Sequence, residues 1–206
     1  MSATTQEDPR VFWDARYVGG DYVFGLEPNR WLAAHEYLLR PRMRAFLPGD
    51  GEGRNGVWLA ERGLVVTTVD ASPVGVDKAR RLAASRGVRL DAHVADLRDW
   101  KYPAAAYELV VLAFVHVEVG ERAGLHAEIA ATLRPGGHLL LEGFTPAHLG
   151  RKGGPKTADR MFTAATLADD FSGLDILHLE ECEVELPAAE RHGGLAAVVR
   201  LLARMP

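Results

Sequence analysis

The stretch Gly49-Asp50-Gly51-Glu52-Gly53-Arg54-Asn55-Gly56 stands between a short apolar run, residues 43–47, and a segment of helix-forming composition, residues 54–62. Its glycines predict a turn whose backbone lies directly against a ligand, as in nucleotide-binding α/β folds. The glycines fit two spacings, GxGxG from Gly49 and GxGxxG from Gly51. Because the second spacing is also the dinucleotide fingerprint, the glycines alone leave the ligand open.

The rest of the chain alternates between apolar strand candidates and helices with recognisable ends. Strands are expected over 43–47, 64–69, 88–95, 107–115 and 138–144, and helices over 29–39, 54–62, 72–86, 121–133 and 162–171. This alternation predicts a parallel sheet with helices on both faces. The last two strand candidates, 174–186 and 196–203, are joined by a short link, which predicts an antiparallel hairpin.

Composition narrows the classes of protein that remain. The 206 residues are 48% hydrophobic and 25% charged, typical of a globular protein, and we expect one domain over residues 1–206. A net charge of −4 indicates no nucleic-acid partner. The single Cys182 excludes an intrachain disulfide and a cysteine zinc site, and the histidines show no metal-site spacing. Residues 1–10 lack a signal-peptide core and no apolar run could span a membrane, so we expect a cytoplasmic protein without membrane contact.

Acidic residues near the predicted strand ends favour one ligand over another. Asp50 and Glu52 would repel a pyrophosphate on the glycine turn, although acids there can also cap the helix. Asp70 ends the second strand, twenty-one residues after Gly49, where a carboxylate can accept hydrogen bonds from both ribose hydroxyls. Ser72 already provides the N-cap of the next helix. Asp96 ends the third strand, where it can accept a hydrogen bond from an adenine amino group, with Leu97 against the ring.

Four segments together resemble the class I S-adenosylmethionine (SAM)-dependent methyltransferases. They are the glycine turn, Val69-Asp70, Ala95-Asp96-Leu97, and Leu133-Arg134-Pro135-Gly136-Gly137-His138-Leu139, which is the most specific of the four. The resemblance extends over about residues 11–204. It implies a Rossmann-like, doubly wound sheet of seven strands in the order 3-2-1-4-5-7-6, mostly parallel with an antiparallel C-terminal strand. Residues around Phe12, Tyr22 and Pro28 resemble the small bacterial branch that is similar to tellurite-resistance and thiopurine methyltransferases.

The resemblance implies SAM as the cofactor. The residues expected to bind it are Gly49, Asp50, Gly51, Gly53, Arg54, Asp70, Ala71, Asp96, Leu97 and Phe114. The chain departs from the family at Leu47, where the usual residue is an acid that helps hold the methionine end of SAM. That role is either lost or taken over by Asp50.

Seven aromatic residues crowd into residues 12–37, within a segment, 1–40, that we expect to cap the active site. Trp13, Tyr17, Tyr22 and Phe24 are predicted to lie near the substrate, where they can face the sulfonium through cation–π attraction. Ordinary aromatic packing is the alternative, and it is the role expected for Trp31 and Tyr37.

Two residues are candidates for a general base. His116 follows the fourth strand at the same edge of the sheet, and Glu142 lies in the fifth strand. A thiolate or selenide acceptor would need no base, and His116 would then only shape the pocket. The basic, glycine-rich residues 150–156 form either a substrate-binding lid or a solvated loop.

The sequence therefore predicts a SAM-dependent methyltransferase acting on a small-molecule acceptor, such as a thiol or another chalcogen centre. Two alternatives stay open: a NAD-dependent oxidoreductase, because of the GxGxxG spacing, and a non-catalytic SAM-binding module, because of Leu47. The oligomeric state is left undetermined.

Overall fold

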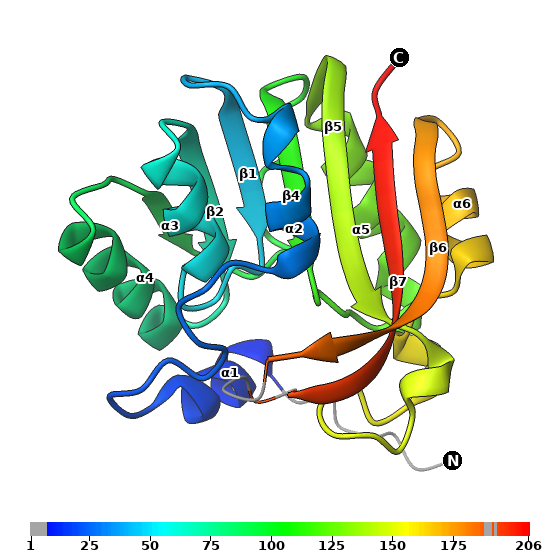
Figure 1. Ribbon diagram of the computed structural model, residues 1–206, viewed down its shortest axis with the longest axis horizontal. Helices are drawn as coiled ribbons and strands as arrows, with labels where there is room; N and C mark the ends of the chain where they lie inside the picture. Colours follow the sequence, from blue (N-terminus) through cyan, green and yellow to red (C-terminus); the bar gives the residue numbers. More distant parts are fainter. Residues whose placement is uncertain (1–7, 188–190, 192) are drawn as a thin grey trace.

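The computed structural model describes residues 8–187, 191 and 193–206, and its centre is a seven-stranded sheet (Figure 1). The strand order β3-β2-β1-β4-β5-β7-β6 is the predicted one. All neighbours pair in parallel except β7, which is antiparallel to both β5 and β6, so the predicted hairpin is confirmed. The strands are β1 (Arg44–Pro48), β2 (Val65–Asp70), β3 (Asp91–Val94), β4 (Tyr107–Ala113), β5 (Leu133–Phe144), β6 (Asp175–Leu186) and β7 (Gly194–Arg204).

Helices cover both faces of this sheet, as the alternation of elements predicts. The first core cluster lies between the sheet and α5 and α6, and includes Phe46, Ile129 and Leu167. The second lies between the opposite face and α2 and α3, and includes Leu47 and Leu59. The helices are α1 (Pro9–Tyr17), α2 (Arg30–Ala34), α3 (Arg54–Glu61), α4 (Pro73–Ser85), α5 (Val119–Ala131) and α6 (Ala164–Asp170), with 3-10 turns at Glu36–Leu38, Pro146–His148 and Ala158–Arg160.

Several boundaries differ from the sequence predictions. The helix expected over 29–39 is the five-residue α2 followed by a 3-10 turn. The third strand is only four residues long. Strand β5 begins five residues early, because Leu133 pairs with Tyr107 of β4, and Gly136 and Gly137 exchange backbone hydrogen bonds with Met205, close to the end of the chain. A pairing between segments so far apart in the chain leaves no local pattern in the sequence.

Helix α1 lies beyond the carboxyl ends of the parallel strands and packs against α4 (Figure 1). It begins after Asp8, whose side chain accepts a hydrogen bond from the Arg10 amide. Asp14 then docks the helix, since its carboxylate accepts hydrogen bonds from the Ser72 hydroxyl at 2.5 Å and from the Val74 amide at 3.3 Å. The N-terminal segment is thus fixed to the first turn of α4. No helix in the described part of the chain is long and apolar enough to cross a membrane.

A buried polar network connects α2 to strands β5 and β7. Glu142 in β5 accepts a hydrogen bond from Arg200 Nε at 2.7 Å and from Asn29 Nδ2 at 2.6 Å. The Asn29 side chain also caps α2 by accepting from the Leu32 amide, and its backbone amide donates to Asn55 in α3. Only 2% of the Glu142 side chain is exposed, so this carboxylate depends on its partners.

We expect Arg200→Met to lower the free energy of unfolding by about 3 kcal/mol, because it leaves the Glu142 charge buried and unpaired. Urea denaturation measures the change. Glu142→Gln combined with Arg200→Met should recover part of the loss. The exposed pair of Arg81 and Asp77 provides the control, since Arg81→Met should change stability by less than about 0.5 kcal/mol. Equal losses in both arginine variants would contradict the buried network.

Candidate functional site

The glycine turn is packed against other parts of the chain. Gly51 and Gly53 have φ values of 56° and 87°, in the left-handed region that favours glycine. A Cβ on Gly51 would lie 2.4 Å from the Tyr17 hydroxyl, and one on Gly53 would lie 2.5 Å from the Ala79 Cβ. The turn therefore lacks side chains at these positions because α1 and α4 approach its backbone.

Asp70, at the end of β2, lies at the centre of this arrangement. One carboxylate oxygen accepts from the Gly51 amide and the other from the Ser72 amide, both at 2.9 Å. Burial raises the pKa of Asp70 to about 6, although the two amide hydrogen bonds act in the opposite direction. The predicted ribose acceptor thus also connects the glycine turn to the N-terminus of α4.

Asp50 lies under the first turn of α3. Its Oδ2 accepts from the Gly56 amide at 3.1 Å, so the side chain helps cap a helix whose N-cap residue, Gly53, has no side chain. Its Oδ1 is buried and has no hydrogen-bond partner among the described residues. Burial raises the pKa of Asp50 to about 8. Leu47, in place of the usual acid, is 1% exposed and belongs to the core between the sheet and α3.

Glu52 neither caps a helix nor lies open to a ligand, the two roles that the sequence suggested for it. Its carboxylate forms a buried ion pair with Lys78 Nζ at 2.8 Å and accepts from the Val23 amide at 2.8 Å. The prediction that the charges of Asp50 and Glu52 repel a pyrophosphate therefore needs correction. Lys78 pairs with Glu52, and burial raises the pKa of Asp50 to about 8.

Asp96 and Leu97 follow β3. Both oxygens of Asp96 bind the guanidinium of Arg98, which lowers the pKa of Asp96, and the backbone amide of Arg98 donates to the same carboxylate. Leu97 is partly buried against the core, and its carbonyl accepts from the Tyr102 hydroxyl. An adenine amino group would therefore compete with Arg98 for Asp96, and the adenine role of both residues stays a prediction.

The remaining predicted cofactor residues surround the same strand ends. Arg54 donates to the carbonyls of Phe24 and Glu27, at 3.0 Å and 3.4 Å, so its guanidinium connects α3 to the loop before α2. Phe114 directly follows β4 with a φ of 58°. Strain of this kind in a non-glycine residue is concentrated at functional sites. Ala71 lies between Asp70 and the N-cap of α4.

The environment of His116 does not suit a general base. Its Nδ1 lies 2.8 Å from the Arg160 carbonyl, and its Nε2 accepts from the Phe144 amide at 3.1 Å. Nδ1 must therefore carry the proton, and both ring nitrogens are engaged by backbone groups. Burial lowers the pKa of His116 to about 4. This geometry favours a structural role for the ring, which stacks on Phe162 at 4.6 Å.

The other substrate-proximal candidates divide into two groups. Trp13 and Tyr17 stack at 5.4 Å, and Phe24 lies within 6.4 Å of both, so these three rings form one cluster at the glycine turn. Tyr22 instead donates its hydroxyl to the Lys78 carbonyl in α4. Glu142 is fully engaged by Arg200 and Asn29, which leaves it unavailable as a base in this structure.

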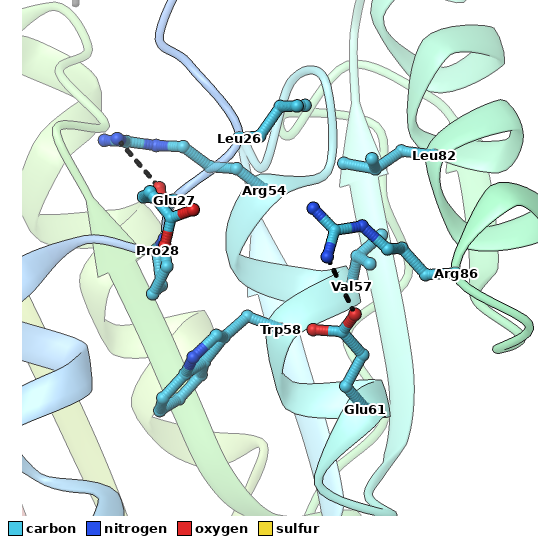
Figure 2. A pocket seen from close by; sticks show the side chains of 9 residues that line it. All are labelled: Leu26, Glu27, Pro28, Arg54, Val57, Trp58, Glu61, Leu82 and Arg86. Carbon is cyan, nitrogen blue, oxygen red and sulfur yellow. Dashed lines mark hydrogen bonds and ion pairs between the residues drawn. The ribbon is translucent and has the colours of Figure 1, made fainter.

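A small cavity lies beside the loop before α2, between that loop and helices α3 and α4 (Figure 2). Its volume of about 40 Å³ has room for a few waters and not for a nucleoside. Arg54 and Arg86 enter it from α3 and from the end of α4, and their partners are the Glu27 backbone and the Glu61 carboxylate (Figure 2). In the described residues, no group of three or more His, Cys, Asp or Glu side chains could bind a metal.

Known methyltransferases are similar to this chain in sequence and in fold. Residues 48–137 match a methyltransferase domain family. The chain is 32% identical to the cypemycin N-terminal methyltransferase of a Streptomyces species, over 96% of this chain and 86% of that protein. A structure described as converting a disulfide bond into a thioacetal group in echinomycin biosynthesis has a TM-score of 0.75 at 21% identity, and covers 95% of this chain and 92% of its own. TehB from Haemophilus influenzae has a TM-score of 0.72 at 14% identity, covering 96% and 67%.

The strand order, the glycine turn and the acid at the end of β2 define the class I SAM-dependent methyltransferases. The near full-length similarity to a curated methyltransferase shows that this chain belongs to that family. It is an enzyme that uses SAM, and neither the NAD-dependent nor the non-catalytic alternative is supported. The residues present fit SAM, because Asp70 ends β2 beside the glycine turn, and the buried Oδ1 of Asp50 has no hydrogen-bond partner in the described chain.

The raised pKa of Asp50 predicts a pH dependence of stability. An acid whose pKa rises on folding stabilises the protein fully below its unfolded pKa, near 4, and loses that contribution as the pH rises through about 8. The contribution of Asp50 to stability should therefore fall between pH 5 and pH 8. Asp50→Asn should reduce this fall by more than about 1.4 kcal/mol, the equivalent of one pKa unit.

Urea denaturation at several pH values measures the effect of Asp50→Asn. Asn keeps an oxygen that can accept from the Gly56 amide. Asp99→Asn, in an exposed loop, is the control and should leave the profile unchanged. Parallel profiles for wild type and Asp50→Asn would show that Asp50 is ionised in the folded protein.

Proposed function

We propose that this enzyme transfers the methyl group of SAM to a small-molecule acceptor that supplies its own nucleophile, such as a thiolate or another chalcogen anion. The observation that supports this most directly is the state of the two candidate bases. His116 has both nitrogens bonded to backbone, and Glu142 is bound by Arg200 and Asn29. An acceptor that is already ionised needs neither of them.

The cofactor would be held by the glycine turn, by Asp70 and by residues after β3 and β4. When bound, SAM supplies an activated methyl group for in-line displacement. The protein's own contribution is to orient the acceptor and to exclude water. The rings of Trp13, Tyr17 and Phe24 suit that task, because they form one cluster beside the turn and aromatic faces attract a cation.

A second candidate acceptor is a primary or secondary amine, such as a peptide N-terminus. The similarity to a cypemycin N-terminal methyltransferase supports it. An amine must reach the site in its neutral form and a thiol as its anion, so both methylations would increase with pH up to the pKa of the acceptor itself, which is about 8 for a peptide N-terminus and about 8.5 for a thiol. The sulfur chemistry of the echinomycin protein supports the thiol candidate instead, through a likeness of fold alone.

We expect Asp70→Ala to weaken SAM or S-adenosylhomocysteine binding at least 100-fold, because it removes the predicted ribose acceptor and releases the Gly51 amide. Isothermal titration calorimetry measures the affinity. Asp70→Asn keeps one acceptor oxygen and should lose less, whereas Asp99→Ala in the exposed loop should bind like wild type. If no variant and no wild-type preparation binds either ligand, the proposed function is wrong.

A screen of thiols, selenite, tellurite and amines should find an acceptor whose own ionisation sets the pH dependence of kcat/KM. We expect His116→Gln to lower stability and to leave the midpoint of that profile unchanged, because the ring makes only backbone hydrogen bonds. Loss of methyl transfer by more than 1000-fold in a His116→Gln protein of wild-type Tm would restore the role of general base.

A further inference from the structure

The backbone of Val23 is held from both sides. Its amide donates to Glu52 Oε2 at 2.8 Å, and its carbonyl accepts from the Arg191 amide at 3.0 Å. Glu52 belongs to the glycine turn, and Arg191 lies in the link between β6 and β7. The hairpin formed by these strands curls beneath the carboxyl ends of the parallel strands toward α1 (Figure 1). Three segments distant in sequence therefore meet at one residue of the loop between α1 and α2.

Lys78 of α4 completes this junction. Its Nζ lies 2.8 Å from Glu52 Oε1 and donates to the Asp21 carbonyl at 2.6 Å. The Lys78 carbonyl accepts from the Tyr22 hydroxyl at 3.2 Å. Consecutive residues 21–23 thus each make a hydrogen bond to the Glu52–Lys78 pair, two through backbone atoms and one through a side chain.

Burial makes this junction cooperative. The side chains of Lys78 and Glu52 are only 4% and 3% exposed. A buried ion pair is favourable only when its remaining donors and acceptors are satisfied, and here residues 21 and 23 satisfy them. Opening of the loop would expose the pair or leave it with unmet hydrogen bonds. The hydrogen bonds to the ion pair therefore favour the position in which the loop packs against the glycine turn.

We propose that Glu52 and Lys78 are positioning residues that hold the loop of residues 18–29, and with it Arg191, closed against the glycine turn. Glu52 lies between Gly51 and Gly53, so the backbone that forms the cofactor turn also carries the carboxylate that closes the loop. The pair acts through the loop and needs no contact with either substrate. Closure of the ligand-free protein does not depend on which acceptor is methylated, and only the kinetic test below rests on the proposed function.

Amide hydrogen exchange of the full chain without ligand tests this directly. The reporters are the Val23, Gly25 and Arg191 amides, all hydrogen-bonded at this junction or in the turn beside it. In Lys78→Met we expect them to exchange at least tenfold faster, with the amides of β4 and α5 within threefold of wild type. Asp77→Asn removes the exposed charge of its ion pair on the same helix and should leave all amides unchanged.

A double variant separates positioning from simple stability. Lys78→Met leaves the Glu52 charge buried alone and can lower the global stability, whereas Glu52→Gln with Lys78→Met leaves no charge there. We expect the double variant to regain wild-type Tm while its reporter amides still exchange at least tenfold faster. Recovery of both Tm and reporter protection would overturn the proposal, as would wild-type protection in Lys78→Met.

Steady-state kinetics adds a readout of function. With a thiol acceptor, the double variant should show at least a fivefold higher KM for the thiol and a calorimetric S-adenosylhomocysteine affinity within threefold of wild type. An unchanged KM beside fast-exchanging reporters would show that closure of the loop makes no contribution to acceptor binding. If no methyl transfer occurs even in the wild-type enzyme, the proposed function fails, and the exchange data still decide the closure of the loop.

Discussion

The carboxylate of Asp70 joins the parts of this protein that we propose form the cofactor site. Its two oxygens accept from the Gly51 and Ser72 amides, so one side chain at the end of β2 fixes both the glycine turn and the start of α4. Ser72 in turn binds Asp14, which docks α1. The cap, the turn and the sheet are therefore connected through consecutive hydrogen bonds that begin at a single buried acid.

Much of this arrangement could be predicted because it depends on local patterns. The alternation of apolar segments predicted the parallel sheet, and the resemblance to a family implied the order of its strands. Asp70 was found from its place at the end of a strand. The Ser72 cap was visible as a serine before a proline, and it accepts from the Gly75 amide as such a cap should. Boundaries that depend on distant pairing, such as the early start of β5 opposite Met205, were not predictable.

The roles of Glu52 and Lys78 were missed for a related reason. Lys78 looks like an ordinary surface lysine in a helix, and its partner lies 26 residues away. One signal was nevertheless present. Gly75 and Leu82 are three residues before and four residues after Lys78, which places the lysine on the buried face of α4. A charge on a buried helical face requires a partner, and in the structure that partner is Glu52 of the glycine turn.

The same contacts change the argument from charge that favoured SAM over a dinucleotide. Fixed negative charges on the turn do not explain the preference for SAM, since Lys78 pairs with Glu52 and the pKa of Asp50 is raised to about 8. The raised pKa values of Asp50 and Asp70 instead show that burial and mutual repulsion already disfavour negative charge there. A pyrophosphate would add to that cost. A sulfonium and an ammonium near these carboxyls would lower both pKa values and recover part of the desolvation energy.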